Sequence, residues 1–97
     1  MHPSSPCEAI AKRRRLEIRY DGYPRVVEVH AVGRTKEGNW LMRVWQVRGG
    51  SSSEPAGWKL MRLDEVGLVS ISKEEAQVPR AGYKRTDPAM AHIECQV

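Results

Sequence analysis

The chain has 97 residues, of which 40% are apolar and 29% charged, and its net charge is +4. This length supports one small core without a second domain, and the apolar content excludes an intrinsically disordered chain. No apolar run reaches the ~20 residues that a membrane-spanning helix needs. Near the N-terminus the cations follow the short apolar patch, which is the reverse of a secretory signal. We therefore expect a soluble cytoplasmic protein whose modest positive charge favours polyanionic partners over other partners.

The two cysteines, Cys7 and Cys95, lie near opposite ends of the chain. Two thiols do not form a disulfide framework, and the chain has no Cys-x-x-Cys motif. The three histidines are too scattered to indicate a metal site. The sequence thus predicts two unpaired thiols, no metal and no cofactor. A bridge that joins the two ends is the alternative.

Residues 5–15 have the pattern of a short helix. Ser5 is a plausible N-cap, Pro6 suits the first helical position, and Glu8 would complete a capping box with Ser5. Four consecutive cations, Lys12 to Arg15, then fall in the expected last turn, where positive charge complements the helix dipole. This position explains the cationic run without a ligand, although the same run would suit contacts with phosphates.

Alternating apolar and polar residues next predict five strands. The first two, at 16–20 and 25–34, are joined by Asp21-Gly22, a strong hairpin signal. We expect Val27, Val29 and Ala31 of the second strand to share one face. The third strand, 40–47, is largely apolar on both faces, which indicates a central position. A Gly- and Ser-rich loop separates it from strands at 58–63 and 66–72.

The chain after Lys73 contains two prolines and shows no steady period. The sequence therefore predicts a lead over residues 1–6, a domain over residues 7–73, and a C-terminal tail over residues 74–97 that is irregular or docked on a partner. One short helix followed by five short strands predicts a mainly β fold. We expect a small, strongly bent barrel of the Sm-like or SH3-like kind, because closure removes most unpaired sheet edges.

The segments "LEIRYDG", "RVVEVHAVG", "GNWLMRVW" and "KLMRLDEV" occur in an order that resembles the WYL domain over about residues 8–72. Trp40 is kept from the tripeptide that names the family, and Glu65 stands where the family usually has Arg. The resemblance implies a divergent, stand-alone Sm-like barrel that senses nucleic acid or a nucleotide in bacterial transcription regulation. By position, it implies ligand-binding roles for Tyr20, Arg25, His30 and Arg62.

The alternation by itself places two aromatic and two basic side chains on one outer face. Arg43 and Trp45 point outward from the third strand, and Trp58 and Arg62 from the fourth. Aromatic rings stack on bases, and guanidinium groups bind phosphates. This pattern predicts binding of single-stranded nucleic acid or a nucleotide-like anion. In the alternative, the helix, the tail or another subunit covers this face, and the domain is a protein-interaction or oligomerisation module.

No constellation of catalytic residues is visible in the sequence. Ser51 to Ser53 have no His and acid at a recognisable spacing, and the adjacent Asp64 and Glu65 do not face each other in regular structure. A lone His30 on a strand is more often structural than catalytic. We therefore expect a non-enzymatic regulatory or sensor module, with a nucleic acid, a nucleotide, a second copy or a regulator protein as partner and no membrane contact.

Overall fold

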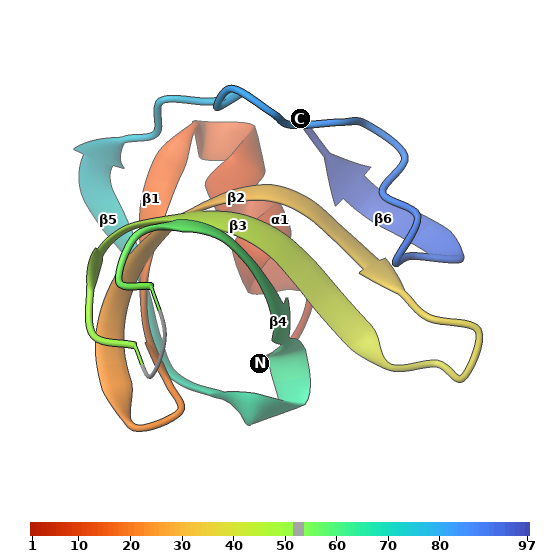
Figure 1. Cartoon of the computed structure of the whole chain (residues 1–97), viewed down its shortest axis with the longest axis horizontal. Coiled ribbons are helices and arrows are strands. Elements are labelled where there is room, and N and C mark those ends of the chain that lie inside the picture. Colours follow the sequence, from red (N-terminus) through yellow and green to blue (C-terminus); the bar gives the residue numbers. More distant parts are fainter. Residues whose placement is uncertain (52–53) are drawn as a thin grey trace.

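The computed structural model describes residues 1–51 and 54–97; Ser52 and Ser53 of the predicted loop lie outside the described residues. Figure 1 shows strands that curve around a common interior, with one helix against them. In chain order, the elements are α1 (Ser4–Lys12), β1 (Arg14–Tyr20), β2 (Tyr23–Arg34), β3 (Trp40–Gly49), β4 (Gly57–Arg62), the 3₁₀ turn η1 (Leu63–Glu65), β5 (Val66–Glu75) and β6 (His92–Gln96). A mainly β fold with one short N-terminal helix is confirmed.

The strands form one antiparallel sheet in the order β4-β3-β2-β1-β5, with β6 paired to β2 outside this path. The long β2 pairs with two strands along the same edge. Its first half, Tyr23 to Val27, pairs with β1, and its second half, Ala31 to Arg34, pairs with β6. No pairing within the described residues joins β4 to β5, so the sheet is curved but not closed. The prediction of five strands in a closed barrel therefore differs from the structure.

β6 is the strand that the sequence pattern missed. It lies in the segment predicted to be irregular, because a five-residue strand with mixed polarity has no clear period. Its place is set by β2, where a Cβ at Gly33 would lie 2.3 Å from the carbonyl oxygen of His92. Glycine at this position lets the backbone of β6 approach β2, and the last part of the chain joins the same sheet.

The helix begins earlier than expected. Its N-cap is Pro3, and no side chain caps the N-terminus, so the predicted capping box at Ser5 is wrong. At the other end, Arg13 adopts a left-handed conformation with φ of 54° and turns the chain into β1. Only Lys12 of the cationic run lies in the helix, where it pairs with Glu8 at 2.6 Å. The remaining cations cap the helix or begin the strand.

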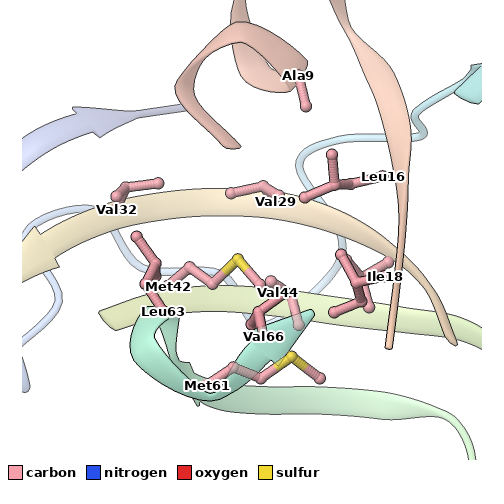
Figure 2. Packing of buried hydrophobic residues seen from close by; sticks show 11 residues of the cluster. Ala9, Leu16, Ile18, Val29, Val32, Met42, Val44, Met61, Leu63 and Val66 are labelled. Carbon is pink, nitrogen blue, oxygen red and sulfur yellow. The ribbon is translucent and has the colours of Figure 1, made fainter. Parts of the chain in front are cut away.

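Side chains from α1 and from β1 to β5 converge on one interior (Figure 2). The turn between β1 and β2 is as predicted, since Asp21 and Gly22 both have positive φ, as a type I′ turn requires. A β-bulge at His30 shifts the register of β2 against β3. Val29 lies opposite Val44, and Ala31 lies opposite the preceding residue, Arg43. The prediction that Ala31 shares a face with the two preceding valines is therefore wrong. Ala31 packs in a second cluster with Leu41 and Met90.

A disulfide joins Cys7 in α1 to Cys95 in β6, across a sequence separation of 88 residues. The prediction of two unpaired thiols is therefore wrong, and the alternative of a bridge between the two ends holds. The sequence favoured free thiols because nothing in the spacing of two distant cysteines shows that β6 returns to the helix. Both cysteines are half-buried and contact the main hydrophobic core.

Candidate ligand-binding site

The outer face of β2, β3 and β4 carries a cluster of aromatic rings. Trp45 and Trp58 are direct neighbours in the β3–β4 register, and their rings meet edge to face at 5.3 Å. The fully buried ring of His30 lies 4.7 Å from Trp58 and 5.0 Å from Tyr83. This is the face that the sequence predicted for ligand contacts. It is covered by residues 76–91 of the same chain, which we call the covering segment.

Glu28 fastens the start of the covering segment to the sheet. Its carboxylate is fully buried and accepts hydrogen bonds from Nε of Arg80 at 2.7 Å, from the backbone N–H of Gln77 at 2.8 Å and from Nε of Arg15 at 3.0 Å. Burial by itself raises the pKa of Glu28, but these three donors outweigh it and hold the pKa below its usual value. The guanidinium of Arg80 also lies over the ring of Trp45.

The hydrogen bonds of His30 define its tautomer. The carbonyl oxygen of Glu28 can only accept, so Nδ1 of His30 carries the proton at 3.0 Å. The backbone N–H of Arg80 can only donate, so Nε2 of His30 accepts it at 3.0 Å. Burial lowers the pKa of His30, and the nearby charge of Arg80 lowers it further, against opposing effects of Glu28. His30 is thus a neutral structural group that holds the covering segment.

This arrangement predicts that stability falls in mild acid. In the unfolded chain the pKa of a histidine is about 6.5, whereas burial lowers the pKa of His30 in the folded protein. Below about pH 6.5 the unfolded chain therefore binds a proton that the folded protein does not bind, and the free energy of unfolding decreases. We expect a loss of about 1 kcal/mol between pH 7.5 and 5.5, relative to the non-titrating variant His30→Gln. Urea unfolding at the two pH values measures it. Equal losses in both proteins would assign the effect to other groups.

A pocket of about 310 Å³ opens where the covering segment meets β3 and β4. Its lining comprises Arg43, Trp58, Gly82, Tyr83, Lys84, Asp87 and Pro88. The rings of Trp58 and Tyr83 are stacked with centroids 6.2 Å apart, and the indole N–H donates to the carbonyl oxygen of Ala81. These contacts set two aromatic surfaces in the pocket.

The charged side chains of the pocket differ in how many hydrogen bonds and ion pairs they form. Arg43 forms a two-pronged ion pair with Asp87 through Nε at 2.6 Å and Nη2 at 3.2 Å, which lowers the pKa of that carboxyl. Nη1 of Arg43 is left without an acceptor among the described residues. The exposed Lys84 forms no hydrogen bond or ion pair with any of them. The lining therefore has one net positive charge and donors available for an anion.

The six predicted site residues lie in three separate parts of the structure. His30, Arg43 and Trp45 lie under or beside the covering segment. Tyr20 and Arg25 are together on β1 and β2, where Nε of Arg25 donates to the carbonyl oxygen of Tyr20 at 3.2 Å and its guanidinium lies 5.2 Å from the ring centroid. Arg62 is exposed and pairs with Asp64 at 2.7 Å.

Arg25 and Tyr20 form a separate polar site. Arg25 is 5% exposed and pairs with no carboxylate of the described residues; besides the carbonyl oxygen of Tyr20 it donates to Oε1 of Gln46 at 3.1 Å. The hydroxyl of Tyr20 donates to Glu65 at 3.0 Å and accepts from the backbone N–H of Arg62 at 3.3 Å. Burial raises the pKa of Tyr20, and the bond to Glu65 adds to this effect. Neither residue lines the pocket.

Sequence reasoning missed the part of the pocket that comes from the tail. Tyr83, Lys84 and Asp87 all lie in the segment predicted to be irregular. The only available signal was the combination of an aromatic residue with cations in "GYKR", residues 82–85, which is too short to indicate a site by itself.

Comparison with family models, with curated proteins and with solved structures finds no match for this chain. Across residues 1–51 and 54–97, no helix combines the length and the apolar character needed to cross a membrane. In the same residues, no group of three or more His, Cys, Asp or Glu side chains is placed to hold a metal ion.

Proposed function

We propose that this protein is a non-enzymatic sensor module that binds a nucleotide-like anion, free or as part of a single strand, in the pocket beside Trp58. The observation that carries the proposal is that one pocket combines two aromatic rings with donors of Lys84 and Arg43 that have no acceptor within residues 1–51 and 54–97. Rings of this kind stack on bases, and such cations bind phosphate. The volume of about 310 Å³ is at the small end for ligand pockets, ~300–1,000 Å³, and suits one nucleotide.

The resemblance to WYL domains supports the same function and suggests a role in bacterial transcription regulation. The curved sheet and its order β4-β3-β2-β1-β5 support an open variant of the Sm-like or SH3-like barrel. The pocket is only partly the face predicted by sequence. Arg80 of the covering segment lies over Trp45, which does not line the pocket, and the same segment contributes Tyr83 and Lys84 to the lining.

The disulfide bears on where the protein works. Stable disulfides are typical of oxidising compartments, so the bond between Cys7 and Cys95 favours such a compartment over the reducing cytoplasm that the sequence predicted. Transcription regulation takes place in the cytoplasm, so this role requires a bond that opens and closes there, as cytosolic disulfides usually do.

Titration with adenosine monophosphate and with a labelled single-stranded oligonucleotide tests the proposal. Tryptophan fluorescence and anisotropy at about 50 and 200 mM salt should show binding that weakens with salt. Lys84→Ala should weaken binding about tenfold, because a charge-assisted contact to phosphate is lost. Lys73→Ala on β5 removes the same charge outside the pocket and serves as the matched control.

Equal affinity in the two variants would overturn the proposed pocket. The competing function is protein interaction or oligomerisation. It is favoured by the edges of β4 and β5, which pair with no further strand among the described residues, and by Leu68, which is 77% exposed on β5. No binding of either probe, together with a mass that rises with concentration in sedimentation experiments, would establish that alternative instead.

A further inference from the structure

The last two residues of the chain hold one wall of the pocket. Oε1 of Gln96 accepts a hydrogen bond from the backbone N–H of Thr86 at 3.0 Å. The carbonyl oxygen of Val97 accepts from Nε of Arg85 at 3.1 Å, and it shares the hydroxyl of Tyr83, at 3.3 Å, with the carbonyl oxygen of His30, at 3.1 Å. Part of the wall segment, which we define as residues 82–88, therefore depends on where Gln96 and Val97 lie.

The position of the C-terminus depends in turn on a short edge strand. β6 pairs with β2 over Ala31 to Arg34, and in the part of the chain that the structure describes no second strand lies beside it. The backbone N–H of Val97 adds one bond to the carbonyl oxygen of His30 at 2.8 Å. The covalent attachment of β6 is the bond from Cys95 to Cys7 in α1, a helix that packs on the core through Ala9. The disulfide thus ties the strand that carries the wall contacts to the rigid part of the molecule.

The start of the covering segment is held differently. The backbone N–H groups of Gln77 and Arg80 bond to the buried side chains of Glu28 and His30, both on β2. These contacts do not involve β6. One end of the covering segment is therefore independent of the disulfide. In the wall segment, Arg85 and Thr86 bond to Val97 and Gln96, whereas Asp87 pairs with Arg43 on β3.

We propose that the Cys7–Cys95 disulfide is a redox control of the pocket. The oxidised protein holds the wall segment against β3 and β4, and reduction releases β6 and opens the wall while the rest of the sheet stays folded. The inference rests on the proposed function for the identity of the ligand and on the contacts above for the movement of the wall.

The reductant is a dithiol, and the reaction is thiol–disulfide exchange. A thiolate of the dithiol attacks one half-buried protein sulfur, forms a mixed disulfide and expels the other cysteine as a thiolate, which takes a proton. The second thiol of the reagent then displaces the first cysteine. The protein gains two electrons and two protons as two thiols, and the dithiol leaves as a cyclic disulfide.

Amide hydrogen exchange on the full chain tests the movement without any ligand. Oxidised protein, protein reduced with dithiothreitol, and reoxidised protein are compared. We expect the amides of Thr86, Ala91 and Val97, which bond to Gln96, Arg34 and His30, to exchange at least about tenfold faster after reduction and to recover on reoxidation. The amides of Gln77 and Arg80 and those of β1 and β3 are the internal controls and should stay protected in the reduced protein, even where its lower global stability raises their rates.

Two results would overturn the inference. Unchanged exchange at Thr86 and Val97 would mean that the disulfide does not hold the wall. Loss of protection throughout, including β1 and β3, would mean that the bond supports the whole fold rather than this wall. The variant Cys7→Ser should reproduce the exchange pattern of the reduced protein. If this variant fails to fold, the comparison of the oxidised, reduced and reoxidised natural chain still tests the inference.

Adenosine monophosphate provides the functional readout. Its affinity should fall about tenfold or more on reduction, with Lys73→Ala behaving as the natural chain in both states. Absence of binding to the oxidised protein would refute the proposed function, while the exchange rates still decide whether the disulfide controls the wall. Equal affinity in both redox states would overturn the redox control even if binding occurs.

Discussion

Replacing Glu28 with Gln is expected to lower the free energy of unfolding by about 3–5 kcal/mol, because one partner of a buried ionic network is removed. The carboxylate is fully buried, and two arginines, Arg15 and Arg80, direct their Nε groups at it. The neutral amide removes the charge partner of Arg80 and leaves Arg15 with Glu74 at 3.3 Å, and its NH₂ group cannot accept the bonds that a carboxylate oxygen accepts. Urea unfolding at neutral pH measures the difference.

Glu8→Gln is the matched control for this prediction. It is the same chemical change at an exposed pair with Lys12 on α1, where a surface ion pair contributes about 0–1 kcal/mol. A loss at Glu28 as small as that at Glu8 would show that the buried network contributes little to stability.

The pH dependence at Glu28 follows from the direction of its pKa shift. The pKa is lowered in the folded protein, so the stabilisation is present above the unfolded value of 4.5 and disappears as the pH falls through the folded pKa. In the natural chain, this loss adds, at lower pH, to the one from His30. The variant Glu28→Gln should lack the acid-dependent part that belongs to this carboxyl.

Removing the disulfide by Cys7→Ser together with Cys95→Ser is expected to destabilise the protein by about 4–5 kcal/mol in the chain-entropy model, because the bond closes a loop across 88 residues. The unfolded chain gains this conformational freedom whether or not the native contacts change. A domain of this size is stable by about 5–15 kcal/mol, so the variant keeps its fold with a small margin.

Chemical unfolding of the double variant, compared with the natural chain in the presence and absence of dithiothreitol, measures this loss. The reduced natural chain and the double variant should agree. A double variant as stable as the oxidised chain would show that the bond adds nothing to global stability, and a reductant effect on the double variant would reveal an artefact of the reagent.

The local sequence was sufficient for the features that depend on neighbouring residues. Asp21-Gly22 predicts its turn correctly, because two consecutive residues with positive φ need this chemistry. The apolar alternation likewise predicts the inward positions of Leu16, Ile18 and Met42, which are buried in the core. It also predicts that Trp45 and Trp58 share one face, and the structure places their rings in contact.

The alternation failed at His30, where a bulge interrupts it. A bulge adds one residue to a strand without any local signal, so every position after it changes face. This shift places Ala31 under the covering segment and Val32 in the main core. Glu28 comes before this shift, and its side chain and that of His30 face the covering segment, whose backbone N–H groups bond to both.

Composition, period and turn chemistry act over a few residues, and from them alone follow the strands β1 to β5, the mainly β class and the aromatic outer face. The sixth strand, the disulfide, the covering segment and the pocket depend on partners about 40 to 90 residues away, such as Arg43 with Asp87 and Cys7 with Cys95. Such long-range contacts leave no periodic pattern in the sequence. Which residues meet is decided by how the distant segments pack against each other in the folded chain. The tertiary structure therefore decided that this face carries a pocket built by the tail.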